Sequence, residues 1–278
     1  MDYRKALSIN DAKACVYDCP TWNMKVEAQL LNQTSSARQP DEMDYVLISL
    51  HIPKTAGTSF SEFLVAHFRD GLLMDYKHLP EHISPLRIRA IASCHCALNA
   101  FRRRSNIRCI HGHFLAAKYL SVRRAKFITW MRDPVERLAS HYHYWRRSYT
   151  PESLPLHRKV VEEDWSFERF CLTPEVRNLY SQFLWRFPLE RFDFIGITEH
   201  FEEDFLYFAN RFFGIAPPIP RSNINLEKRG AYVDDPDLRS KIEAYHAQDM
   251  DLYRRAVANR SNRQNRIHCQ TDKEHRNL

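Results

Sequence analysis

The chain has 278 residues, of which 44% are hydrophobic and 13% aromatic, enough apolar material for one sizeable α/β core. A formal net charge of +7 and an isoelectric point of about 9.0 favour an anionic partner, without separating nucleic acid, nucleotide, sulfated sugar and membrane surface. The seven cysteines are odd in number and irregularly spaced, which argues against a complete disulfide framework.

The two ends of the chain differ in composition from its middle. Residues 1–43 are polar and aperiodic, so we expect an irregular N-terminal arm. Residues 44–258 are predicted to form the folded domain, and residues 259–278 a charged C-terminal tail that frays. The N-terminus lacks the apolar stretch of a signal peptide, and no run approaches the roughly 18 apolar residues that cross a bilayer. We therefore predict a cytoplasmic protein without a membrane anchor.

Alternating strands and helices are predicted along the chain. Residues 45–50 form a β-rich apolar run, as expected for a strand that is buried on both faces. Further predicted strands span residues 107–110, 125–131 and 192–197. Predicted helices span residues 59–68, 166–171, 174–185, 202–213 and 236–258. This alternation predicts an α/β fold, a three-layer sandwich with a central parallel sheet.

The first predicted strand runs into the segment HIPKTAGTSF, residues 51–60. A turn from strand to helix aims several backbone N–H groups at one point, which favours an anion. Gly57 allows the backbone to approach a ligand closely, and Lys54 supplies a mobile positive charge. Three hydroxyl groups can donate to an oxyanion, those of Thr55, Thr58 and Ser59. The alternative is an ordinary helix N-cap by one of the threonines.

A second anion-binding element is predicted at the strand of residues 125–131, which runs into the segment RDPVERLASHY. Pro134 suits the first helical turn after a cap by Asp133, so Arg132 ends the strand and Ser140 lies about two turns into the helix. The fork of an arginine and a serine hydroxyl suit a terminal phosphate. The alternative is a local Arg132–Asp133 salt bridge with Ser140 exposed to solvent.

Between these elements lies the sequence His111-Gly112-His113, at the end of the predicted strand 107–110. Groups at the carboxyl ends of parallel strands converge on the ligand crevice, so a histidine there can serve as a general base. The alternative is a structural or solvent-facing histidine, because the chain contains 14 histidines. The sequence Cys94-His95-Cys96 lacks the second ligand pair of a usual zinc site, so we expect no metal.

The two anion motifs, in this order, resemble those of the PAPS-dependent sulfotransferases, in the branch that includes the heparan sulfate 2-O- and 6-O-sulfotransferases. PAPS is 3′-phosphoadenosine 5′-phosphosulfate. The resemblance implies a P-loop NTPase-like sulfotransferase fold, and Arg132 and Ser140 as ligands of the 3′-phosphate. It also implies that the 5′-phosphosulfate is bound by Pro53, Lys54, Thr55, Ala56, Gly57, Thr58 and Ser59.

The pair of histidines resembles the H-G-H signature of the 2-O-sulfotransferases. The resemblance implies His113 as the catalytic base that deprotonates the acceptor hydroxyl, with His111 as a supporting group and Lys54 neutralising the leaving charge. Spacing alone does not decide which histidine is the base. The polar loop 223–230 resembles the late loop that closes over the nucleotide, which makes Arg229 a candidate second contact to the 3′-phosphate.

The resemblance implies a sulfotransferase that moves a sulfuryl group from PAPS to a hydroxyl acceptor, a carbohydrate, with no metal and no nucleic acid. Relatives in this branch reside in the Golgi, a location that here requires an anchor removed from the chain. Paired arginines and three tryptophans can line a glycan groove, although such residues more often form solvated charge and core. They are Arg102–Arg104, Arg123, Arg124, Arg146, Arg147, Trp145, Trp165 and Trp185.

Two other functions remain open from the sequence. An ATP-dependent phosphotransferase is disfavoured because the lysine of the first loop precedes its glycine, unlike the pattern GxxxxGK[ST], and because paired magnesium ligands are missing. A non-catalytic binder of anionic glycans or nucleic acids is supported by the basic charge alone. The candidate base beside two phosphate motifs favours an enzyme.

Overall fold

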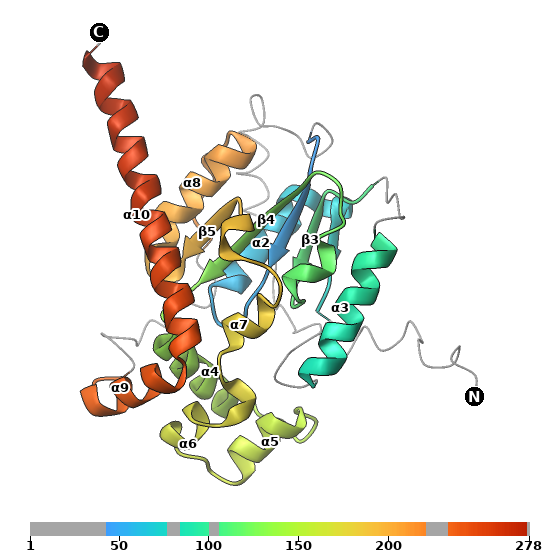
Figure 1. Ribbon diagram of the computed structural model, residues 1–278, viewed down its shortest axis with the longest axis vertical. Helices are drawn as coiled ribbons and strands as arrows, with labels where there is room; N and C mark the ends of the chain where they lie inside the picture. The colour runs from blue at the N-terminus through green and yellow to red at the C-terminus, as the bar shows by residue number, and fades with distance from the viewer. Residues whose placement is uncertain (1–42, 77–83, 100–105, 221–232, 277–278) are drawn as a thin grey trace.

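The computed structural model describes residues 43–76, 84–99, 106–220 and 233–276. Its centre is a parallel sheet in which the described residues form five strands, in the order β2-β3-β1-β4-β5 (Figure 1). The strands are β1 (Val46–Leu50), β2 (Leu72–Met74), β3 (Cys109–Gly112), β4 (Ala125–Met131) and β5 (Phe194–Ile197).

Helices cover both faces of this sheet. The α2 helix (Gly57–Phe68) and the α8 helix (Phe201–Phe213) pack phenylalanine side chains on one face. The short α7 helix (Leu179–Phe183) and the long α10 helix (Ala247–Arg276) lie on the other. Successive β1 residues alternate between the two cores, which explains why the strand is apolar at every position except Ser49. The predicted three-layer α/β architecture is confirmed.

A smaller helical core lies beside the carboxyl ends of the strands, below the sheet in Figure 1. Four helices build it: α4 (Pro134–Ser148), α5 (Pro155–Glu162), α6 (Phe167–Cys171) and α9 (Pro236–Tyr245). At the edge of the molecule, α3 (Pro85–Asn99) packs Ile88 and Ala92 against Leu115, which follows β3 by three residues. This arrangement leaves the loops that follow β1, β3 and β4 between the sheet and the helical core.

The four predicted strands and the helix after β1 form where the sequence indicated, with ends shifted by no more than two residues. The structure adds β2, α3 and α5, which the sequence did not indicate. The predicted helix 174–185 is broken, because Asn178 adopts a left-handed conformation with φ of 50° between a 3-10 turn and α7. The predicted helix 236–258 is also split, between α9 and α10.

The prediction that the chain frays after residue 258 is wrong for residues 259–276, which continue α10. Ion pairs with α8 hold the first part of this segment. Arg260 Nε lies 3.0 Å from Asp204 Oδ1, and Arg263 Nη2 lies 2.8 Å from the same oxygen. At the other end of the domain, Met43 is buried in the core between the sheet and α2, although it was predicted in the arm. Among the described helices, none combines the length and the apolar character that a bilayer span requires.

Candidate active site

The order of the strands creates a crevice at the carboxyl ends of β1 and β4. After β1 the chain passes to β2 and β3 on one side of β1, and after β3 it passes to β4 and β5 on the other. Such a switch in an open parallel sheet is where ligands bind, outside the ends of the two strands. The loop 51–56 follows β1, Arg132 follows β4, and His113 follows β3, the other neighbour of β1. The fold therefore brings the three predicted motifs to one edge of the sheet.

The loop after β1 leads into a helix N-terminus that is prepared for an anion. Lys54 and Ala56 both adopt left-handed backbone conformations, with φ of 69° and 64°. Such conformations gather successive N–H groups into a concave nest. The α2 helix begins at Gly57 with no side-chain hydrogen bond at its N-cap and no acidic residue in its first turn. A helix that begins in this way offers N–H groups and the positive end of its dipole to a negative ligand.

The hydroxyl groups of this loop differ in their burial and in their hydrogen bonding. Thr55 is buried, and its hydroxyl donates to the carbonyl oxygen of Ile52 at 2.8 Å instead of pointing to a free oxyanion position. Its backbone N–H is still part of the loop. Thr58 is exposed, whereas Ser59 is buried, with 7% of its surface accessible. Pro53 is also buried and packs the loop against the domain.

Gly57 has a close neighbour that the sequence did not indicate. A Cβ atom built on Gly57 would lie 1.6 Å from Nε2 of His51, well inside contact distance. The space that the missing side chain leaves is therefore occupied by the His51 ring. The glycine therefore allows an imidazole to reach the start of α2.

Three basic side chains gather around this helix N-terminus. The Lys54 ammonium lies 3.9 Å from the centre of the Tyr144 ring on α4. Burial and, to a smaller extent, the positive charges of Arg147 and Arg132 together lower the pKa of Lys54 to about 8. No carboxylate is among the groups that shift this pKa. Lys54 is thus surrounded by positive charges, and a cluster of cations at a helix N-terminus favours an anion.

This cluster predicts a pH dependence of anion binding. Below pH 8 Lys54 is charged in the free protein, whereas above pH 8 an incoming dianion has to draw a proton onto it. We expect affinity for adenosine 3′,5′-bisphosphate to fall between about pH 8 and pH 9.5, and binding near pH 8.5 to take up protons. Calorimetry in buffers of different ionisation enthalpy measures this uptake. It should disappear in Lys54→Met, and its persistence there would assign the proton to another group.

The turn from β4 into α4 holds Arg132 firmly. Its backbone N–H donates to the Tyr180 hydroxyl at 3.0 Å, and its carbonyl oxygen accepts from the same hydroxyl at 2.6 Å. Its guanidinium is half-buried, with Nη2 3.8 Å from Glu136. Asp133 forms no salt bridge with Arg132 and instead pairs with Arg239 at 2.6 Å, so the local pair considered from the sequence is not formed. Arg132 is thus kept at the crevice by contacts from α7.

The predicted N-cap of α4 is confirmed and limits what this helix can bind. The Asp133 carboxylate accepts from the backbone N–H groups of Val135 at 2.9 Å and Glu136 at 3.0 Å. The first turn of α4 is therefore satisfied by its own cap. A phosphate at this turn depends on side chains, on Arg132 and on the partly exposed Ser140, whose hydroxyl forms no hydrogen bond to any residue in the described ranges.

The structure separates the two histidines of the H-G-H sequence. His111 is 1% exposed, and its Nδ1 lies 2.9 Å from the Ser49 hydroxyl. His113 is half-buried, and its Nδ1 donates to the carbonyl oxygen of His51 at 2.6 Å. That bond places the lone pair of a neutral ring on Nε2, which has no hydrogen-bond partner within the described part of the chain. Burial lowers the pKa of His113 to about 4, so the ring is neutral at pH 7.

Sequence reasoning gave no role to several residues of this edge. His51 stacks on His111 with ring centres 5.2 Å apart, and its Nδ1 lies 3.2 Å from the Tyr76 hydroxyl. Asp75, which follows β2, accepts from Tyr119 at 2.8 Å and pairs with Lys118. His51 was detectable, because it directly follows a predicted strand, as the H-G-H sequence does. The residues after β2 were not, because β2 itself was not predicted.

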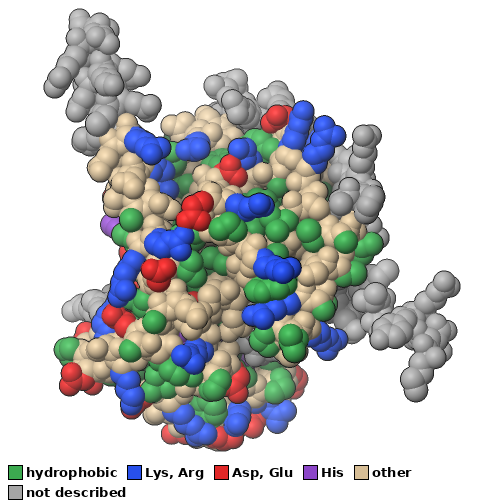
Figure 2. Space-filling model, viewed as in Figure 1, with side chains coloured by type: hydrophobic (Ala, Val, Ile, Leu, Met, Phe, Trp, Pro, Cys, Tyr) green, Lys and Arg blue, Asp and Glu red, His purple; other side chains and the backbone are tan. Residues whose placement is uncertain are grey.

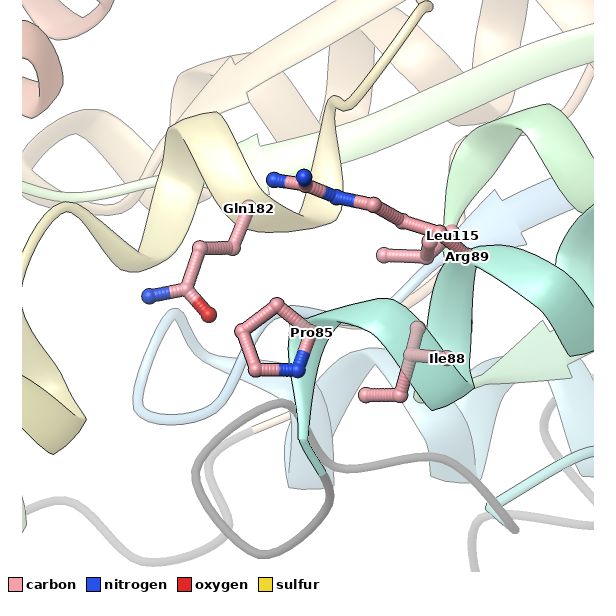
Figure 3. Close-up of a pocket in the computed structure, with 5 residues that line it drawn as sticks. All are labelled: Pro85, Ile88, Arg89, Leu115 and Gln182. Carbon is pink, nitrogen blue, oxygen red and sulfur yellow. The ribbon is translucent and has the colours of Figure 1, made fainter.

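A small pocket opens between α3 and α7 (Figure 3). It is lined by Pro85, Ile88, Arg89, Leu115 and Gln182. Figure 3 shows the Arg89 side chain extending from α3 toward α7. Leu115 lies two residues after His113, and Phe183, next to Gln182, has its ring centre 6.4 Å from that of His113. The Arg89 guanidinium also lies 5.3 Å from the Trp185 ring, so the pocket has a cation and an aromatic side chain at its border.

Most of the other basic and aromatic residues considered for a glycan groove lie elsewhere. Trp145 and Trp165 are each 4% exposed and belong to the helical core, so they cannot stack on a sugar. Arg123 and Arg124 precede β4, at the opposite end of the strand from the crevice. Arg146 pairs with Asp164 at 2.7 Å. The candidate residues Arg102–Arg104 and Arg229 lie outside the described residues.

Figure 2 shows one face of the molecule, on which Lys and Arg side chains are spread with Asp and Glu among them. The positive charge is therefore not gathered into one continuous surface on this face. Within residues 43–76, 84–99, 106–220 and 233–276, no cluster of His, Cys, Asp or Glu side chains is arranged to hold a metal ion. Cys94 and Cys96 are free thiols on α3.

Comparison with known proteins gives matches in structure alone. Neither the family models nor the curated proteins that were searched match the chain. A sulfotransferase from Alicyclobacillus acidocaldarius is similar over 76% of this chain and 94% of its own, with 15% sequence identity and a TM-score of 0.41. Mouse sulfotransferase SULT7A1 complexed with PAP is similar over 82% of this chain and 71% of its own, with 14% identity and a TM-score of 0.32.

Proposed function

We propose that the chain is a sulfotransferase that moves a sulfuryl group from PAPS to a hydroxyl group. The observation that carries this proposal is the uncapped, acid-free N-terminus of α2 beside the Lys54 cluster, with Arg132 and Ser140 on the neighbouring strand and helix. PAPS carries a 5′-phosphosulfate and a separate 3′-phosphate, so its binding requires two anion sites. The order of the two motifs also resembles that of the sulfotransferases.

Each group of the crevice has a role in this proposal. PAPS supplies an activated sulfuryl group when it is bound. The N–H groups of α2 and Lys54 hold the charge that develops on the leaving 5′-phosphate. Arg132 and Ser140 bind the 3′-phosphate through side chains, because Asp133 already satisfies the first turn of α4. His113 Nε2 accepts the proton of the acceptor hydroxyl while the new S–O bond forms.

The acceptor that we propose is a carbohydrate hydroxyl. Its support is the resemblance of the first loop and of the H-G-H sequence to the heparan sulfate branch. Transfer of labelled sulfate from PAPS to a panel of neutral sugars, acidic sugars and phenols tests this choice. Labelling of phenols alone would reject it.

The donor site is tested by calorimetric titration with adenosine 3′,5′-bisphosphate (PAP), in parallel with ATP and magnesium. We expect micromolar affinity for PAP and much weaker binding of ATP. Arg132→Ala should weaken PAP binding about 10- to 100-fold, since it removes a charged hydrogen-bonding partner of the 3′-phosphate. Arg123→Ala is the matched control, because this exposed arginine precedes the same strand at its other end, and its affinity should stay at the wild-type value.

The same titration separates the alternatives that the sequence left open. Preference for ATP with magnesium would replace the sulfotransferase by a phosphotransferase. No binding of PAP would remove the donor site altogether. A non-catalytic glycan binder would keep its glycan affinity in both Lys54→Ala and His113→Ala and would release no PAP from PAPS.

A further inference from the structure

His51 contacts both halves of the candidate site. Its backbone N–H donates to the carbonyl oxygen of Gly112 at 2.8 Å, and its own carbonyl oxygen accepts from His113 Nδ1 at 2.6 Å. Its ring centre lies 4.5 Å from that of His113. Lys54 is one of the charges that act on the His51 ring, which places the ring near the donor loop as well. The residue therefore lies between the candidate base and the candidate anion site.

The Nε2 edge of this ring points at the start of α2. Three ring atoms of His51 would lie within 2.3 Å of a Cβ at Gly57, and the nearest of them is Nε2 at 1.6 Å. The backbone N–H groups of the proposed anion site belong to the same first turn of α2. Within the described ranges, Nε2 has no hydrogen-bond partner of its own. An anionic group of the sulfuryl donor that is bound at this turn of α2 therefore lies close to His51 Nε2.

The tautomer of His51 is linked to its contact with the Tyr76 hydroxyl. Burial raises the pKa of Tyr76, which keeps the phenol protonated, and a side-chain hydrogen bond with Ser61 acts in the opposite direction. The phenol proton is then available for His51 Nδ1, whose distance from the Tyr76 oxygen is 3.2 Å. With Nδ1 accepting, the proton of the neutral ring lies on Nε2. Burial and the charges of His113, His111 and Lys54 lower the pKa of His51 well below its ordinary value, which keeps the ring neutral.

We propose that His51 is a further catalytic residue, whose Nε2–H donates a hydrogen bond to a sulfuryl oxygen of the bound donor. This inference rests on the proposed function. In the transfer, the acceptor oxygen forms a new bond to sulfur, and the bond between sulfur and the 5′-phosphate oxygen breaks with its electron pair left on the phosphate. The acceptor proton passes to His113. His51 keeps its proton and stabilises the charge on the sulfuryl oxygens.

A matched pair of variants tests this contact. Leucine and glutamine are similar in size and both remove the imidazole, but only glutamine keeps an N–H donor at a comparable reach. We expect His51→Leu to weaken PAPS binding about tenfold while PAP binding stays within about twofold of wild type. PAP lacks the sulfuryl group, so the ratio of the two affinities isolates the contact. His51→Gln should keep both affinities within about threefold, and His51→Leu should lower the transfer rate about 100-fold.

The outcomes distinguish this inference from the proposed function. A wild-type protein that binds no PAP contradicts the proposed function itself. A wild-type protein that binds PAP and transfers sulfate, with equal losses of PAPS and PAP affinity in both variants, shows a structural role for His51 and overturns the inference. Nitrogen-15 spectra of histidine-labelled protein provide an independent measurement. A proton on Nδ1 of His51 in place of Nε2 would also overturn it.

Discussion

Replacing His113 with alanine is expected to lower kcat for sulfuryl transfer by about 10²- to 10⁴-fold, the usual contribution of a positioned general base. The physical reason is the bond from its Nδ1 to the His51 carbonyl oxygen at 2.6 Å, which leaves Nε2 as the proton acceptor. PAP affinity should change by less than about threefold, because no phosphate contact depends on this ring. Initial rates of sulfate transfer, together with calorimetry on the same preparation, measure the two effects separately.

The pH profile of sulfuryl transfer by the wild-type protein provides a second measurement of the proposed role. Since burial lowers the pKa of His113 to about 4, the base becomes neutral as pH rises through 4, and kcat/KM should be level from about pH 6 to pH 7.5. It should fall above pH 8 as Lys54 loses its proton. His200→Ala, at an exposed histidine after β5, is the control and should keep the wild-type rate. A His113→Ala variant with normal kcat would assign the base elsewhere.

The fold was largely predictable because its parallel strands are buried on both faces. β1 and β4 consist mostly of apolar residues, and each is followed by a helix start, so composition and spacing both indicate a βα unit. β2 was missed because it has only three residues, none of them fully buried. The continuation of α10 was missed because its anchors are ion pairs with Asp204, 56 residues away for Arg260 and 59 for Arg263, and local patterns do not reveal such pairs.

The candidate site was predictable where a motif directly follows a strand. Lys54, Arg132 and His113 all occupy such positions, and the order of the strands brings them to one edge of the sheet. The sequence does not show which residues contact these three side chains. The role of the Tyr180 hydroxyl in holding Arg132, and of the His51 carbonyl in fixing the tautomer of His113, depends on contacts between segments far apart in the chain.

Gly57 was identified from the sequence, but its contact with His51 was not. The sequence indicated a glycine at a phosphate loop, and the expected reason was close approach of a ligand. In the structure its missing side chain makes room for the His51 ring, which is itself held by His111, His113 and Tyr76. The position of the imidazole and the start of α2 are therefore coupled. A change at Gly57 is transmitted to both the anion loop and the histidines.

Gly57→Ala is accordingly expected to lower PAP affinity and transfer activity about 100-fold, the order of loss that a displacement of about 1 Å can produce at an active site. The added methyl group would lie 1.6 Å from His51 Nε2, so either the ring or the first turn of α2 must move. We also expect a loss of about 1–3 kcal/mol in the free energy of unfolding, as for overpacking of a filled site. Calorimetry with PAP and denaturant unfolding measure these two losses.

Two further variants show whether the steric conflict is the cause. Gly71→Ala is the matched control, because the nearest atom to its added Cβ is Arg108 Cβ at 3.5 Å, an ordinary contact, and it should bind PAP normally. The double variant Gly57→Ala, His51→Ala removes the ring that the methyl group meets and should regain most of the PAP affinity and stability. Recovery of PAP binding without recovery of transfer is the expected pattern, because the double variant still lacks the proposed donor to the sulfuryl group. A double variant no better than Gly57→Ala would mean that the glycine serves the ligand directly, as the sequence first suggested.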